Sequence, residues 1–287
     1  MLVHIKKIIA PLKNNNSAIP AFNVINLETA LGVAKAAEKL RQPVIMQISE
    51  GAANYAGLEI IVDVLKQIAG DKKNSAPIAL HLDHGQDLTL IKKCLELGFS
   101  SVHIDGSHYP LAKNIALTKK IVALAKKYGA WVQGEVGALP GSEDKIKNLK
   151  NKKFFLTNPL DAQKFLLATR VNTLAVSIGN EHGIDKMRRA NFPRLDWGRL
   201  AQIHQLLPHT PLVLHGASGI KTADLTKARH LGIKIVNIDT ELRLAFTNTM
   251  RQILAQDAWV YDPRKILGPA SLAVEKIAAK KIKQLCG

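Results

Sequence analysis

The feature that most constrains the fold is one pattern that the chain repeats eight times. Each repeat is a short apolar run rich in Val and Ile, then polar or glycine residues, then a longer stretch with apolar residues at helical spacing. The runs begin at Ala18, Pro43, Ile78, Ser101, Trp131, Thr173, Pro211 and Ile233. Eight strand–helix units in series predict an α/β fold, either a closed parallel barrel or a long doubly wound sheet. The count of eight favours the barrel.

No Pro-, Gly- or Ser-rich linker divides the 287 residues. We therefore expect a single domain over residues 1–287: a (β/α)8 TIM barrel with a C-terminal helical extension that has no strand of its own. Hydrophobic residues make up 47 % and aromatic residues only 5 %, an aliphatic composition that suits parallel sheets. The sequence has no apolar run of membrane-spanning length, no signal-peptide pattern and no CxxC spacing of its two cysteines. These features predict a cytoplasmic protein with no membrane partner.

The formal net charge of +17 could serve nucleic acid, anionic lipid or an anionic substrate. The lysines, however, are spread along the whole chain. The densest run, Lys145 to Lys153, has no interleaved aromatic residues and no nucleic-acid motif. We interpret the charge as a solvated basic face and expect no nucleic-acid partner. Attraction of an anionic substrate is compatible with this interpretation.

Histidines followed by glycine stand at the ends of three predicted strands, in the segments LDHG, NEHG and LHG. In a barrel of this class the reactive groups lie at the C-terminal strand ends, so His84, His182 and His215 should meet at one rim. Three neutral imidazoles with an open position are a common catalytic zinc arrangement. A lone histidine is more often a satisfied surface or core residue, and we interpret His4, His204, His209 and His230, away from the predicted strand ends, in this way. His81, His103 and His108 lie nearer the rim, but their positions are less informative.

Carboxylates accompany these histidines. Asp83 adjoins His84 and could support the ligand or act as a general acid/base. Asp105 and Glu135 should face the same barrel mouth, where they could bind a second cation, orient a histidine or form a buried ion pair. Spacing alone does not separate these roles.

The stretch from Ala138 to Asn158 is too long and polar for an ordinary turn between strand and helix, as is typical of an active-site loop. It contains Glu143, which could simply be solvated. The flanking Gly137 and Gly141 are compatible with a lid that closes over the site.

Small residues follow the seventh and eighth predicted strands, where this fold often binds phosphate. The two segments are Gly216-Ala217-Ser218-Gly219 and Asn237-Ile238-Asp239-Thr240. Such segments expose backbone N–H groups, and Ser218 and Thr240 add hydroxyl groups. We therefore expect a phosphate site between these loops.

From AFNV at Ala21 to YDPRKILGPA at Tyr261, the chain resembles the class II fructose-bisphosphate and tagatose-bisphosphate aldolases. The segment PIALHLDHG resembles the first signature of that family, and VQGEVGALPGSED resembles the second. The second departs from the family pattern at Gln133, where a Glu is usual, and at Pro140, where Gly or Met is usual. Glu135 carries the role expected of this segment despite Gln133, whereas Pro140 would stiffen the loop.

The resemblance implies a role for each candidate residue. His84, His182 and His215 would bind catalytic Zn²⁺, with Asp105 and Glu135 as outer or second-cation ligands. Asp83 would exchange a proton with the C4 hydroxyl, and Glu143 would exchange the proton on the dihydroxyacetone-phosphate carbon. One phosphate would be held by Gly183, Gly216, Ser218, Asp239 and Thr240, with room for a monovalent cation beside it. The sugar would be contacted by Asn237, Asn23 and Ser49. Arg264 would reach the distal phosphate of the substrate bound to a neighbouring subunit.

The expected function is reversible cleavage of fructose 1,6-bisphosphate to dihydroxyacetone phosphate and glyceraldehyde 3-phosphate through a zinc-stabilised enediolate, without a Schiff-base lysine. Tagatose 1,6-bisphosphate, which differs at one carbon, stays open as the alternative substrate. We expect a homodimer or homotetramer. A zinc hydrolase on this barrel would usually carry an HxH pair on the first strand, which AIPAFNV lacks. A non-catalytic basic binding protein would not need Asp83, Glu143 and the three histidines.

Overall fold

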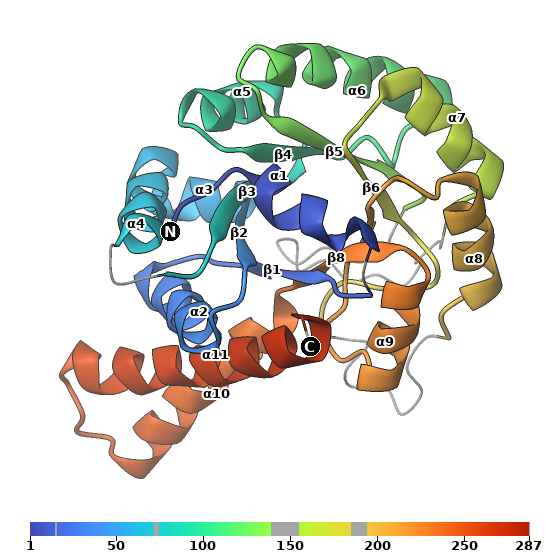
Figure 1. The fold of residues 1–287 in the computed structure, drawn as a ribbon. Helices are drawn as coiled ribbons and strands as arrows, with labels where there is room; N and C mark the ends of the chain where they lie inside the picture. The colour runs from blue at the N-terminus through green and yellow to red at the C-terminus, as the bar shows by residue number, and fades with distance from the viewer. Residues whose placement is uncertain (15, 72–74, 139–154, 185–193, 287) are drawn as a thin grey trace.

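The computed structural model describes residues 1–14, 16–71, 75–138, 155–184 and 194–286. Its parallel strands close into a barrel in chain order, with β8 pairing with β1 (Figure 1). The strands are β1 (Ile19–Asn23), β2 (Val44–Ser49), β3 (Ile78–Gly85), β4 (Ser101–Ile104), β5 (Trp131–Val136), β6 (Thr173–Val176), β7 (Leu212–Leu214) and β8 (Ile233–Ile238). Each lies within one of the eight apolar runs, so the predicted (β/α)8 barrel is confirmed.

Helices follow the strands and pack around the barrel. They are α2 (Leu27–Leu40), α3 (Glu50–Ala56), α4 (Leu58–Gly70), α5 (Leu88–Glu96), α6 (Leu111–Lys126), α7 (Pro159–Thr169), α8 (Trp197–Leu206), α9 (Thr222–His230), α10 (Thr240–Gln256) and α11 (Pro263–Cys286). Their apolar faces and the outer faces of the strands form one continuous core. The strands are therefore buried on both sides, which explains why they are rich in Val, Ile and Leu.

A short helix before the barrel, α1 (Ile5–Ile9), closes one end of it. Ile5, Ile8 and Ile9 pack with inward-facing residues near the starts of the strands in a second apolar cluster inside the barrel. Figure 1 shows α1 lying across this end. Because apolar residues fill the N-terminal half of the barrel, polar groups can gather only at the opposite end, where the strands finish.

The C-terminal extension consists of α10 and α11, joined at a tip that stands away from the barrel (Figure 1). The two helices pack on each other, and α11 also packs on α2. Gly32 of α2 permits this approach, since a Cβ there would lie 2.7 Å from the backbone oxygen of Ser271. The predicted helical extension is thus confirmed, and α11 returns the chain to the barrel wall.

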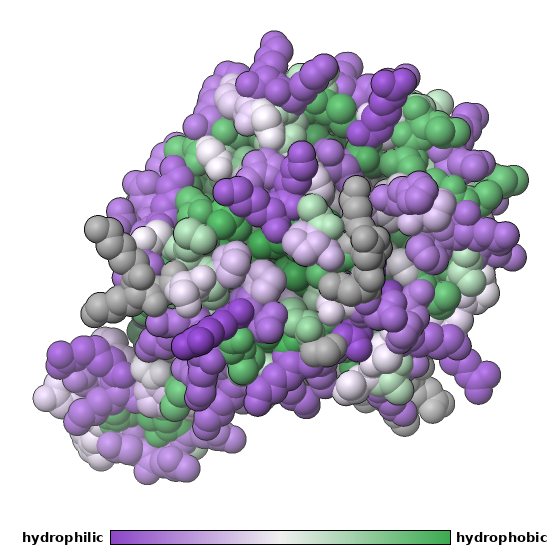
Figure 2. Space-filling model, viewed as in Figure 1, coloured by the Kyte–Doolittle hydropathy of each residue, from purple (hydrophilic) through white to green (hydrophobic). Residues whose placement is uncertain are grey.

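The surface at the α1 end is largely hydrophilic. Figure 2 shows this face, with apolar side chains scattered among polar ones, as is usual for solvated protein surface. Among the described residues, no helix is both long and apolar enough to span a membrane.

Candidate active site

A break in the pairing of β3 with β4 places two consecutive site residues side by side. Successive side chains of a regular strand point to opposite faces, so neighbours would not normally share one site. Here the register shifts between Leu82 and Gly85, and Asp83 and His84 together lie opposite one residue of β4, His103. This is a β-bulge, which re-aims side chains in this way. His84 has φ of 48°, in the left-handed region that non-glycine residues seldom occupy.

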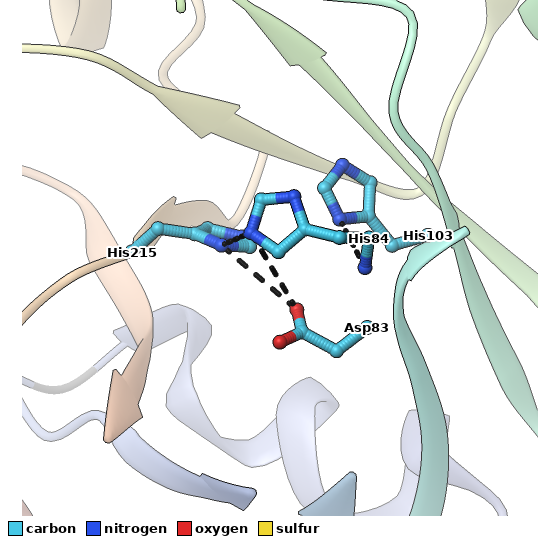
Figure 3. A group of neighbouring side chains, drawn as sticks. All are labelled: Asp83, His84, His103 and His215. Atoms are coloured by element: carbon cyan, nitrogen blue, oxygen red, sulfur yellow. Dashed lines mark hydrogen bonds and ion pairs between the residues drawn. The ribbon is translucent and has the colours of Figure 1, made fainter. Parts of the chain in front are cut away.

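Imidazole rings from different strands meet at this bulge (Figure 3). Nε2 of His84 lies 2.9 Å from Nδ1 of His215, which follows β7. The ring of His103 lies 4.8 Å from that of His84, centroid to centroid. The ring of His182, after β6, lies 5.0 Å from that of His84 and 5.9 Å from that of His215. The structure therefore brings the three predicted histidines together and adds His103, which the sequence placed near the rim but did not single out as a ligand.

The two candidate cation-binding carboxylates lie beside these rings. Oδ2 of Asp105 is 2.9 Å from Nδ1 of His84, and Ser107 donates to the other oxygen of Asp105 from both N–H and Oγ. Glu135, on β5, is 1 % exposed, with Oε2 3.4 Å from Nε2 of His103. Two overlapping groups have ligand atoms that lie within 4.8 Å of one another: Asp83, His84, His103 and His215; and His84, His103, Asp105 and Glu135.

The electrostatics of this cluster suit a cation. Burial alone would lower the pKa of His84, but the carboxylates of Asp83 and Asp105 raise it well above its usual range. Burial, reinforced by His84, lowers the pKa of His215 well below its usual range, so that ring stays neutral. Oε2 of Glu135 is buried and accepts no hydrogen bond from the described residues. A positive charge amid these groups is stabilised, and neutral imidazole and carboxylate groups are the ligands that Zn²⁺ takes. The residues present therefore fit a bound divalent metal.

Asp83 is held from both sides by amide groups. Nδ2 of Asn23 donates to Oδ2 at 2.9 Å, and Nδ2 of Asn237 donates to Oδ1 at 3.2 Å. Gln47, fully buried on β2, in turn donates to Oδ1 of Asn23 at 2.6 Å. Burial raises the pKa of the Asp83 carboxyl group. The amides predicted to touch the sugar thus also orient Asp83, and Gln47 supports Asn23. Its polar side chain in the apolar run PVIMQIS was the only sequence signal for it.

Gln133 contacts a candidate metal ligand. It is 1 % exposed, and Nε2 of its amide lies 2.8 Å from Nε2 of His215. Groups that hold the second nitrogen of a metal-bound imidazole fix its orientation and tautomer. The departure from the family pattern at this position therefore falls on a residue that touches the site. Register places Gln133 beside His103 across β4 and β5. Both are polar residues within apolar runs, and that was the signal available.

The predicted phosphate loops lie together after β7 and β8. Gly216 has φ of 60°, and a Cβ there would overlap the backbone oxygen of Glu181. The N–H of Gly219 donates to Oε1 of Glu241 at 3.0 Å, and the N–H of Glu241 donates to Oγ of Ser218 at 3.3 Å. Glu241, which the sequence interpretation did not single out, therefore ties the two loops together. Its other oxygen, Oε2, lies 2.7 Å from Nζ of the buried Lys281 of α11.

The remaining residues that were predicted to contact the substrate lie on different elements of the barrel. Asp239 and Thr240 are buried at the start of α10, and Asp239 pairs with Arg243 at 2.6 Å. Ser49 pairs with Asp83 in the β2–β3 register and caps α3 through Oγ. Gly183 has φ of 84°, next to His182.

Arg264 is not brought into the cluster of this chain. It lies near the start of α11, with its side chain 91 % exposed and paired with Asp262 at 3.0 Å. Glu143 and Pro140 lie outside the described residues, as does the basic run from Lys145 to Lys153.

A (β/α)8 barrel with clustered imidazoles and carboxylates at its C-terminal rim has the form of a metal-dependent barrel enzyme. The chain matches the family described as fructose-bisphosphate aldolase class-II over residues 3–287. It is 34 % identical to a fructose-bisphosphate aldolase from Geobacillus stearothermophilus over 284 residues, 99 % of this chain and 96 % of that one. The chain therefore belongs to the class II fructose-bisphosphate aldolase family and is a lyase that acts on a phosphorylated sugar.

Solved structures agree in sequence and in shape. The YdjI aldolase from Escherichia coli K12 is 29 % identical, with a TM-score of 0.84 and coverage of 99 % of this chain and 97 % of that one. A putative fructose-1,6-biphosphate aldolase from Coccidioides immitis is 28 % identical, with a TM-score of 0.87 and coverage of 99 % and 96 %.

Proposed function

We propose that this chain cleaves fructose 1,6-bisphosphate reversibly into dihydroxyacetone phosphate and glyceraldehyde 3-phosphate, with Zn²⁺ held by His84, His182 and His215. The observation that carries the proposal is the Asp83 carboxylate, which lies between two amides and beside the facing nitrogens of His84 and His215. This pairs an acid/base group with a cation site, the combination that metal-assisted aldol cleavage uses.

Bound Zn²⁺ would supply Lewis-acid polarisation of the ketone oxygen. The protein's own contribution centres on Asp83, which accepts the proton of the C4 hydroxyl as the C3–C4 bond breaks and returns it in the reverse direction. Asn23 and Asn237 keep its two oxygens oriented. Burial raises the pKa of Asp83 and makes its carboxylate a stronger base than a solvated one.

The other assignments belong to the same proposal. Glu143 exchanges the proton on the dihydroxyacetone-phosphate carbon, and Asp105 and Glu135 hold a second cation or support His84. One phosphate lies at the loops after β7 and β8, where Gly183, Gly216, Ser218, Asp239 and Thr240 hold it, with a monovalent cation as an optional neighbour. Ser49, Asn23 and Asn237 contact the sugar.

In the same proposal, a neighbouring subunit completes the site. Arg264 is exposed near the start of α11, where its guanidinium group pairs with Asp262, and we propose a homodimer or homotetramer in which it grips the distal phosphate of the substrate bound to a neighbouring subunit. The free thiols of Cys94 and Cys286 are compatible with a reducing cytoplasm, where we place this single-domain protein.

The test is a coupled cleavage assay on fructose 1,6-bisphosphate and tagatose 1,6-bisphosphate, before chelation, after chelation and after Zn²⁺ is restored. We expect chelation to abolish activity, Zn²⁺ to restore it and the fructose substrate to be preferred.

Asp83→Ala should lose cleavage by about 10²–10⁴-fold while binding Zn²⁺ normally, whereas Glu143→Ala should slow proton exchange on dihydroxyacetone phosphate. Full activity without metal, or inactivation by borohydride with substrate, would sink the proposal. Preference for the tagatose substrate would replace the fructose assignment.

A further inference from the structure

His103 is a buried imidazole that the proposed chemistry does not use. His103 is fully buried on β4, and its ring packs against the rings of His84 and His215. It lies directly opposite the bulge that carries Asp83 and His84.

The bulge interrupts the hydrogen-bond ladder between β3 and β4. A bulge leaves a backbone group without its ladder partner, and an unpaired buried N–H is costly. At this bulge the N–H of His84 donates to the side chain of His103, at 3.2 Å from Nδ1. The imidazole of His103 therefore takes the place of the missing backbone acceptor. The donor is His84, whose φ is 48°.

This contact also determines how the ring of His103 is used. Because Nδ1 accepts the N–H of His84, the proton of the neutral imidazole lies on Nε2. Nε2 lies 3.4 Å from Oε2 of Glu135. Both nitrogens thus face groups of the protein: one faces the backbone of a candidate metal ligand, and the other faces a candidate outer carboxylate.

We infer that His103 is a positioning residue: its Nδ1 holds the bulge of β3 in the conformation that turns Asp83 and His84 into one site, and it does so without binding the metal itself. The inference rests on the proposed metal role of His84. A left-handed backbone at a bulky residue costs free energy and persists only where its surroundings hold it. The hydrogen bond from the N–H of His84 to Nδ1 of His103 supplies part of this stabilisation, and it leaves the ring of His84 free.

The matched variants are His103→Asn and His103→Leu. Oδ1 of Asn stands the same number of bonds from the backbone as Nδ1 of His, and Leu has the shape of Asn but accepts no hydrogen bond. His81 provides the control, because it is 3 % exposed on β3 outside the bulge, with Nδ1 bonded to Oγ of Ser101 at 2.8 Å. His81→Leu should lose stability without changing metal affinity.

Two measurements separate positioning from general stability. In metal-free protein, hydrogen exchange of the peptide containing His84 should be about tenfold faster in His103→Leu, from loss of one backbone hydrogen bond, and nearly unchanged in His103→Asn. Zn²⁺ affinity by chelator competition should fall about 10–100-fold in His103→Leu, the scale for residues that orient metal ligands, and less than threefold in His103→Asn. If His103→Leu does not fold, His103→Gln takes its place, because its amide stands one bond too far out.

The inference is overturned if His103→Asn is as impaired as His103→Leu, or if neither differs from the parent protein. It is also overturned if Co²⁺ bound to His103→Asn has an altered ligand-field spectrum, since His103 would then be a metal ligand. Failure of the parent protein to bind Zn²⁺ would instead refute the proposed function, while the exchange result would still report on the bulge.

Discussion

The buried ion pair between Lys281 and Glu241 links the C-terminal helix to the proposed phosphate loops, and Lys281→Met tests its importance. Nζ of Lys281 lies 2.7 Å from Oε2 of Glu241, and the two side chains are 3 % and 17 % exposed. Met preserves the length and apolar packing of the stem but removes the charge. The Glu241 carboxylate would then remain partly buried without its cation, with the N–H of Gly219 on its other oxygen.

The expected cost follows from that environment. Removing one partner of a fully buried pair costs about 3–5 kcal/mol. Glu241 keeps one backbone donor and some contact with water, so we expect Lys281→Met to lower the free energy of unfolding by about 2–4 kcal/mol. Because Glu241 ties the loop that contains Ser218 and Gly219 to the segment after β8, we also expect the KM for fructose 1,6-bisphosphate to rise more than kcat falls.

Urea unfolding at neutral pH measures the first effect, with the slope m unchanged. The double variant Lys281→Met, Glu241→Gln is the control: the amide oxygen of Gln can still accept from Gly219, but no buried charge is left. It should regain more than half of the lost stability. A loss below about 1 kcal/mol for the single variant, or a double variant no more stable than the single one, would refute this reasoning.

Two further predictions concern contacts of the site. Gln133→Leu should weaken Zn²⁺ binding about 10–100-fold in chelator competition, because Nε2 of His215 loses its amide neighbour, and Gln133→Glu should not; equal affinity in both would show that His215 needs no such support. Arg264→Ala should lower kcat/KM for fructose 1,6-bisphosphate by a factor equivalent to about 2 kcal/mol and leave fructose 1-phosphate cleavage unchanged. Equal losses on both substrates would assign Arg264 to folding or assembly.

The barrel could be predicted from the sequence because its cause is local and repeated. Apolar runs buried on both faces alternate with amphipathic helices, and eight such units close a parallel sheet. The same reasoning located the site, since parallel strands all finish at one rim. It therefore predicts that His84 and His215 meet, and in the structure their facing nitrogens lie 2.9 Å apart.

The contacts within that rim depended on tertiary structure. Strand periodicity assigns side chains to alternate faces, but a register shift is a property of two paired strands and leaves no mark in either run alone. The bulge that unites Asp83 with His84 was therefore hidden, and so was the role of His103 opposite it. Asn23 and Asn237 lie far apart in the chain, and the family resemblance predicted that both touch the sugar. Their hydrogen bonds to Asp83 could not be predicted, because closure of the barrel brings the three residues together. The sequence by itself determined which groups reach the rim, because that follows from order along the chain; pairing between strands decided which of them touch.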